Sequence, residues 1–316
     1  MDTESVENRE GVKTWLVDQI TKSEFFHQKL HQWGLLTVAD ELERVRGESL
    51  SWDREALGIS GKAWDKVIHC GIKPIRVFAH PEVLTSIPGA VGYYRMLAMV
   101  SQKSMSGVGI SVGAYETAQK QPDYPTSERI AVHLNAIISR LVEADEVLDE
   151  RELDLWRGMA AGAQAQGSWV NAKGDAAQAT ISGLVQRRLA DKNLVKEHAP
   201  DWSWVSLVDG RRFVFSDDPD IAVYRGDAIR AAIEVKGGID PAGVLERLGA
   251  ALKTLSRIRE KNPTATTILV MHESVMTETA TRDLGINRAV VTNWMTIEDL
   301  LTKQESCEEL FDLLGI

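Results

Sequence analysis

The stretch DDPDIAVYRGDAIRAAIEVKGGIDPAG, residues 217–243, places charged side chains on or beside two short apolar runs. The runs DIAVY (220–224) and AIRAAIEVK (228–236) have the length and composition of buried strands. A charge buried in a strand costs free energy unless it is paired or binds an ion. The charged residues of these two runs therefore favour a functional site over ordinary core.

The segment RGD (225–227) has the composition of a turn, so the two runs are predicted to form a β-hairpin. Side chains alternate between the two faces of a strand, so Glu234 and Lys236 project to the same side while Val235 points into the core. In such a hairpin Asp220 lies across from Glu234. We therefore expect two carboxylates and one ammonium group to share a small site, with Gly237-Gly238 leaving room for a ligand to approach the backbone.

Two carboxylates at this spacing repel each other unless a cation lies between them. Mg²⁺ prefers oxygen ligands and retains several waters, so we predict that Asp220, Glu234 and the carbonyl of Val235 bind Mg²⁺. Lys236 is predicted to orient a water molecule and to stabilise negative charge in the transition state. These groups are suited to hydrolysing a phosphodiester bond.

Neighbouring acidic residues are interpreted differently. Asp217 and Asp218 precede Pro219 in a loop and are predicted to shape the turn, and Asp227 is predicted to form the hairpin turn. The alternative for the charged residues of the strands themselves is a salt-bridge cluster on a half-exposed sheet, which contributes little to stability.

The composition limits the classes of function. The formal net charge of −10 and the isoelectric point of about 5.3 argue against a protein that coats DNA without sequence preference. There is no run of about 18 uncharged apolar residues, so we expect no membrane span. The acidic start, MDTESVENREGVK, argues against a leader peptide, and we expect a cytoplasmic protein. The glycine-rich segment GVGISVG (107–113) lacks the features of a nucleotide site, so no nucleotide cofactor is expected.

The predicted secondary structure changes from mainly helical to mixed near the middle of the chain. Residues 1–165 show mainly helical periodicity, interrupted by prolines. Residues 166–316 are predicted to begin with a helix after a glycine turn. An antiparallel meander follows, and strands then alternate with helices, including the predicted strands TTILVMH (266–272) and RAVVT (288–292). This order predicts an α/β fold in which a mixed sheet is flanked by helices.

The pair Pro219-Asp220, followed after 13 residues by Glu234-Val235-Lys236, resembles the signature of the PD-(D/E)XK nuclease superfamily. The helix predicted after the second strand and the helical first half resemble type II restriction endonucleases, in particular the XcyI-like group. The resemblance implies a restriction-endonuclease-like core in 166–316, with residues 1–165 serving DNA recognition and dimerisation. It implies Mg²⁺-dependent cleavage of double-stranded DNA within a restriction-modification system. It also implies a homodimer and a GC-rich palindromic target similar to CCCGGG.

One position departs from this pattern. Many members of the superfamily carry a glutamate on the helix before the PD strand, and that position falls at Gln178 here, with Asp175 one turn earlier. A glutamine can contact a metal-bound water, so both residues are candidates for supporting the site.

Several basic residues are candidates for DNA contact. Lys253 is expected to meet a phosphate, and Arg257 or Arg259 to reach a guanine edge in the major groove. The full set of candidates is Lys103, Lys173, Arg187, Arg188, Lys253, Arg257 and Arg259. Ordinary solvated helix faces with charge pairing are the alternative interpretation.

Two other functions remain open from the sequence. A DNA repair or junction-resolving nuclease would use the same core, and a catalytically inert DNA-binding protein would retain the fold alone. The long helical first half favours a protein that reads sequence, and the intact trio Asp220, Glu234 and Lys236 favours catalysis.

Overall fold

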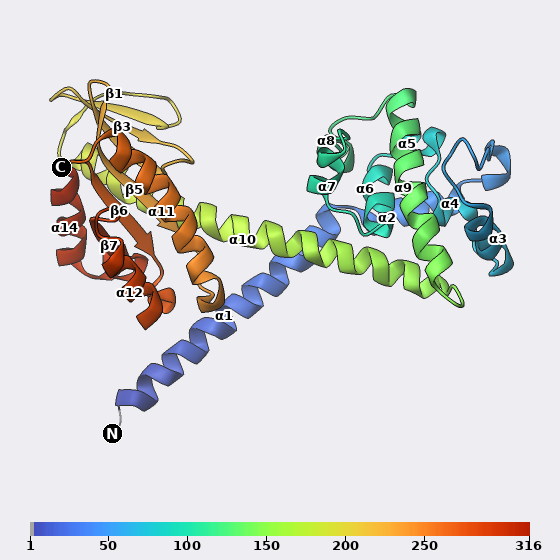
Figure 1. Ribbon diagram of the computed structural model, residues 1–316, viewed down its shortest axis with the longest axis horizontal. Coiled ribbons are helices and arrows are strands. Elements are labelled where there is room, and N and C mark those ends of the chain that lie inside the picture. Colours follow the sequence, from blue (N-terminus) through green and yellow to red (C-terminus); the bar gives the residue numbers. More distant parts are fainter. Residues whose placement is uncertain (1–2) are drawn as a thin grey trace. The chain divides into compact units, whose positions relative to one another are not determined.

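The computed structural model describes residues 3–316, apart from the side chains of residues 3–15 and 17. The chain divides into two compact units, residues 1–169 and residues 170–316 (Figure 1). The sequence predicts this division at 165/166, with a helix after a glycine turn in the second part. That turn is absent, because helix α10 (Glu150–Asp191) continues for 42 residues through Gly174. Alanines around the glycines of α10 keep the local helix propensity high enough for the helix to continue.

The first unit is helical, in agreement with the periodicity of its sequence. Its elements before α10 are α1 (Thr3–Gln32), α2 (Leu35–Arg44), η1 (Gly47–Ser49), α3 (Gly61–His69), α4 (Pro74–Val77), α5 (Pro81–Ser86), α6 (Ala90–Leu97), α7 (Gln102–Gly107), α8 (Gly113–Glu116) and α9 (Tyr124–Ala144). Prolines begin the short helices α4 and α5, where a missing backbone N–H costs nothing.

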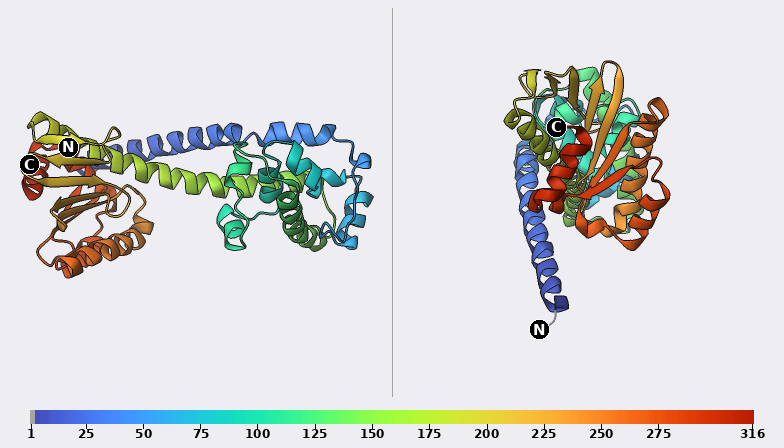
Figure 2. Two further views of the ribbon diagram at one scale, coloured as in Figure 1. Left: turned by 90° about the horizontal axis from the view of Figure 1, so that it is seen from above. Right: turned by 90° about the vertical axis from the view of Figure 1, so that its left-hand side faces the viewer.

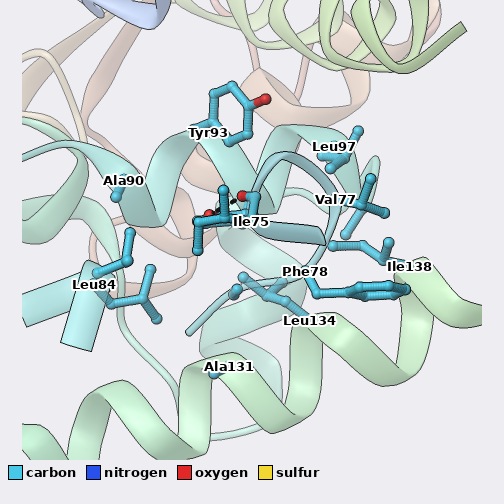
Figure 3. Packing of buried hydrophobic residues seen from close by; sticks show 14 of the residues in the cluster. Ile75, Val77, Phe78, Leu84, Ala90, Tyr93, Leu97, Ala131, Leu134 and Ile138 are labelled. Carbon is cyan, nitrogen blue, oxygen red and sulfur yellow. Dashed lines mark hydrogen bonds between the residues drawn. The ribbon is translucent and has the colours of Figure 1, made fainter. Parts of the chain in front are cut away.

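The core of the first unit lies between α9 and the short helices (Figure 3). Ala131, Leu134 and Ile138 of α9 are fully buried there. The side chain of Asn135 is also fully buried on this face of α9. Its Oδ1 accepts from the Ala79 amide at 2.7 Å, and its Nδ2 donates to the carbonyls of Ala79 at 2.9 Å and Leu57 at 3.0 Å. Asn135 thus satisfies three buried backbone groups that belong to loops.

The second unit contains a seven-stranded mixed sheet with the strands in sequence order. The strands are β1 (Val195–His198), β2 (Trp204–Leu207), β3 (Arg211–Phe215), β4 (Ile221–Arg225), β5 (Ala228–Lys236), β6 (Thr266–Met271) and β7 (Asn293–Thr296). Strands β1 to β5 pair in antiparallel order, and β5, β6 and β7 pair in parallel. The mixed sheet and the meander that precedes its parallel part are therefore as predicted.

Helices cover both faces of this sheet (Figure 2). On one face lie the second half of α10, α13 (Ile297–Thr302) and α14 (Gln304–Leu314). On the other face lie α11 (Val244–Lys261) and α12 (Glu278–Ile286). The 3₁₀ turns η2 (Pro241–Gly243) and η3 (Glu273–Val275) precede these two helices. Both faces are apolar because each is buried, which is typical of a sheet with parallel crossovers.

Two details of the strand prediction change in the structure. Strands β1 and β2 were not recognised, because both are only four residues long. The run RAVVT, predicted as a strand, forms a turn instead, and β7 begins one residue after it. The amides of Val290 and Val291 both bond to the carbonyl of Asn287, so the end of α12 determines this conformation and overrides the β propensity of the valines.

No helix in the described part of the chain is long and apolar enough to cross a membrane.

Replacing Asn135 with leucine should destabilise the first unit by about 3 kcal/mol, because the Ala79 amide and two carbonyls lose their buried partner. Urea unfolding of the full chain measures the change. Arg129→Ala, at an exposed position on the same helix, is the control and should shift the unfolding free energy by less than about 0.5 kcal/mol. An Asn135→Leu protein as stable as this control would contradict the assignment.

Candidate active site

The β4–β5 hairpin brings the two acidic residues of the sequence motif together. Ile221 pairs with Ile233, so the next position of the antiparallel register sets Asp220 opposite Glu234. Asp220 Oδ2 accepts a hydrogen bond of 2.6 Å from the amide of Val235. This bond joins the start of β4 to the end of β5, and it fixes the direction of the Asp220 carboxylate.

Lys236 completes the group on the same face of the sheet. Its Nζ lies 2.6 Å from Glu234 Oε1. Both carboxylates are buried, with Asp220 6% and Glu234 4% exposed, whereas the lysine side chain is 22% exposed. The three side chains share the face of Ala232, which packs against α11, so α11 covers the face on which they lie.

Burial dominates the electrostatics of the two carboxyl groups. It raises the pKa of Glu234 to about 7, against the opposing effect of its hydrogen bond with Lys236. Burial also raises the pKa of Asp220, although the hydrogen bond from Val235 partly offsets this. Both groups therefore lie where their negative charge is unfavourable without a further cation.

The oxygen atoms that remain are suited to a hard cation. Glu234 Oε2 is buried and has no hydrogen-bond partner among the described residues. The described residues contain no group of three or more His, Cys, Asp or Glu side chains arranged to hold a metal. The side-chain ligands that the pair offers are thus two carboxylates, and the carbonyl of Val235 stays a predicted third ligand. This set matches Mg²⁺, which commonly takes one or two carboxylates and keeps its other positions for water and substrate.

Gly237 lets the chain leave β5 in close contact with α10. A Cβ atom at this position would lie 2.7 Å from the carbonyl oxygen of Lys173 and 2.6 Å from the Cβ of Ala177. Only glycine permits such an approach without moving the backbone. The backbone of α10 therefore holds the end of the strand that carries Glu234 and Lys236.

The turn before β4 has a contact that the sequence analysis missed. Asp218 accepts hydrogen bonds from Thr254 Oγ1 at 3.0 Å and from Arg257 Nη2 at 2.8 and 2.5 Å. The hydrogen bond from Arg257 lowers the pKa of this carboxyl group. Asp218 thus ties the turn to α11, in addition to shaping it. The only sequence signal is the i, i+3 spacing of the two α11 partners, which is too common to be informative.

The two residues expected to support the site lie on α10. Gln178 donates from Nε2 to the carbonyl of Ser216 at 2.6 Å and so holds the same turn from the other side of the sheet. Asp175 is exposed. No hydrogen bond links either side chain to Asp220 or Glu234 in the described residues. The role of Gln178 in binding a metal-bound water stays a prediction.

The model of the XcyI restriction endonuclease family matches residues 52–311, which include most of the helical unit and the whole sheet. The chain belongs to this family.

Two curated members are similar to the chain. The type II restriction enzyme XcyI of Xanthomonas campestris pv. cyanopsidis is 27% identical over 215 residues, which cover 60% of this chain and 61% of that enzyme. The type II restriction enzyme Cfr9I of Citrobacter freundii is 24% identical over 211 residues, covering 60% of this chain and 62% of that enzyme. The matched region thus spans about three fifths of each relative.

The basic residues proposed for DNA contact have different surroundings. Arg188 forms a two-pronged ion pair with Glu308 and stacks on Phe311, and Arg259 donates to the carbonyls of Ala265 and Ala289. These two guanidinium groups already hold helices in place. Arg257 is paired with Asp218 but half exposed. The remaining four are Lys103, Arg187 and Lys253, which are exposed, and Lys173, which is partly buried.

The close packing of Gly237 gives a stability prediction. Gly237→Ala should destabilise the second unit by about 1–3 kcal/mol, because its Cβ would overlap backbone atoms of α10. Gly249→Ala is the matched control, since that glycine is exposed on α11 with no atom near the new Cβ, and it should stabilise by about 0.5–1 kcal/mol. Thermal and urea unfolding measure both changes. Equal effects of the two substitutions would argue against the packing described.

Proposed function

We propose that this chain is a type II restriction endonuclease that hydrolyses phosphodiester bonds in double-stranded DNA at a specific site, with Mg²⁺ as its cofactor. The observation that carries the proposal is the joint placement of Asp220, Glu234 and Lys236 on one hairpin. Membership of the XcyI restriction endonuclease family supports it.

In this proposal Asp220, Glu234 and the Val235 carbonyl would hold the cation, which would be the partner that Glu234 Oε2 lacks among the described residues. Bound Mg²⁺ would polarise a phosphate oxygen and lower the pKa of a water molecule. The ammonium group of Lys236 orients the attacking water and stabilises the negative charge that develops on the phosphate. The hydrogen bond from Val235 keeps the Asp220 carboxylate in place during the reaction.

The target and the assembly are proposed on the resemblance to the family. A GC-rich palindrome similar to CCCGGG would be cut by a two-fold symmetric homodimer, each subunit acting on one strand. Residues 1–165 would serve recognition and dimerisation, and residues 166–316 the chemistry. A role in a restriction-modification system would place the enzyme in the cytoplasm, where it meets incoming DNA.

Plasmid digestion with and without Mg²⁺ tests the proposal. Discrete fragments that require Mg²⁺, with ends that map to one sequence, are the expected result. Smearing, or cutting confined to branched DNA, would indicate a repair or junction-resolving nuclease. Absence of cleavage over a range of divalent ions would indicate a DNA-binding protein without catalysis.

Replacing either carboxylate should separate binding from cleavage. Asp220→Ala and Glu234→Ala should each abolish cleavage in Mg²⁺, because the cation loses one of two side-chain ligands, while binding of specific DNA in Ca²⁺ survives. Gel-shift and single-turnover cleavage assays measure the two properties. Glu309→Ala, at an exposed position on α14, is the control and should cleave normally. A fully active Glu234→Ala enzyme would remove the proposed metal site.

Replacing Lys236 should lower the cleavage rate more than the affinity for Mg²⁺. Lys236→Ala should slow single-turnover cleavage about 10²- to 10³-fold, the size typical for losing one transition-state contact. The Mg²⁺ concentration for half-maximal rate should change little, because the carboxylates remain. Lys236→Arg should recover part of the rate, and Lys196→Ala, at an exposed position on β1, should have none of these effects. An unchanged single-turnover rate in Lys236→Ala would refute the role given to this residue.

A further inference from the structure

A groove opens on the face of the sheet that carries the acidic pair. It has a volume of about 480 Å³ and lies between α11 and the β4–β5 hairpin. Asp218 and Pro219 line it. Asp220 follows two residues after Asp218, and two residues of extended chain span at most about 7 Å, so the groove ends beside the candidate active site. The cationic residues that line it are Arg230 of β5 and Arg257 and Lys261 of α11.

A β-bulge directs Arg230 into this groove. Val223 pairs with Ala231 and Tyr224 pairs with Ile229, so Arg230 is an extra residue with no partner on β4. A bulge bends the strand and changes the direction of a side chain. Arg230 is exposed, and its side chain makes no hydrogen bond or ion pair within the described residues.

The two α11 residues face the same groove from the opposite wall. Arg257 and Lys261 are four positions apart, which corresponds to about 6 Å along the helix on one face. Lys261 is exposed and makes no side-chain ion pair with any described residue. This spacing is short enough for the two cations to contact neighbouring phosphates of a single strand.

The lining of the groove carries more positive than negative side chains, although the whole chain is acidic. The protein has 36 basic and 46 acidic residues, whereas this lining has three cations and two carboxylates, Asp218 and Asp227. Asp218 is already paired with Arg257, whose side chain is 53% exposed. All hydrogen bonds of Arg257 to described residues come from Nη2, so its other N–H groups are available to a ligand.

We propose that this groove binds the phosphate backbone of the DNA strand next to the scissile phosphodiester, with Arg230, Arg257 and Lys261 each contacting a phosphate. The inference rests on the proposed endonuclease function and extends it to the residues that position the substrate. Arg257 has a second task, since it holds Asp218 when no DNA is bound and contacts phosphate when DNA is present. The groove contributes to affinity and register without reading base sequence.

The salt dependence of DNA binding tests this directly. Affinity for a fluorescent duplex is measured by anisotropy over a range of salt, with Ca²⁺ in place of Mg²⁺ so that no cleavage occurs. The slope of log K against log salt is negative, and each phosphate contact contributes about 0.9 to its magnitude. Arg230→Gln and Lys261→Gln should each reduce the magnitude of the slope by about 0.9. A triple variant that adds Arg257→Gln should reduce it by about 2.7.

Matched variants separate charge from structure. Arg230→Lys should keep the wild-type slope because the charge remains, and Arg282→Gln, at an exposed position on α12, should keep it as well. Asp218→Asn should leave the slope unchanged and the binding equal or tighter, since it frees Arg257 without removing it. Circular dichroism establishes that each variant is folded.

The outcomes distinguish this inference from the endonuclease proposal. A triple variant with the wild-type slope, in a protein that cuts DNA, would overturn the groove assignment alone. If the variants show the expected changes of slope but the wild-type protein cuts no DNA, the groove is supported and the endonuclease proposal is overturned. Loss of slope in Arg282→Gln equal to that in Arg230→Gln would overturn the groove, because the effect would be that of surface charge in general.

Discussion

The antiparallel pairing of β4 with β5 is the constraint on which the candidate active site depends. Its register sets Asp220 opposite Glu234, and the hydrogen bond from the Val235 amide to Asp220 joins the ends of the two strands. A shift of one residue would turn Glu234 and Lys236 to the other face of the sheet. That shift is unfavourable, because the charges would enter the apolar core on the face of α10, α13 and α14, where Ile233 and Val235 are buried now.

Contacts with two helices, α10 and α11, hold this hairpin end in place. Gly237 lets the chain pass against the backbone of α10. Asp218 and Gln178 tie the turn before β4 to α11 and α10 respectively. The carboxylates are therefore pre-positioned, while one oxygen of Glu234 has no hydrogen-bond partner among the described residues. Burial that raises the pKa of two neighbouring carboxyl groups is more frequent at functional centres than at structural ion pairs.

The sequence was most informative where the relevant geometry is local. Alternation along β5 and the turn composition of RGD predicted the hairpin, the shared face of Glu234 and Lys236, and the position of Asp220. Predictions that depended on propensity alone were less reliable. RAVVT has strand composition but ends a helix, and the glycines near 174 lie within the continuous helix α10. At RAVVT the hydrogen bonds to the end of α12 outweighed a strand preference of about 1 kcal/mol, and at Gly174 the surrounding alanines offset a helix-breaking preference of similar size.

By itself the sequence determined the fold class, the order of the main strands and the three residues proposed for chemistry, because strand alternation and turn composition act over a few neighbouring positions. Only the tertiary structure decided how Asp218, Arg230 and Arg257 are used. Asp218 and Arg257 are 39 positions apart, and the bulge at Arg230 exists only relative to the register of β4. Contacts of that kind arise when α11 packs across the sheet, and no local pattern in the chain encodes them.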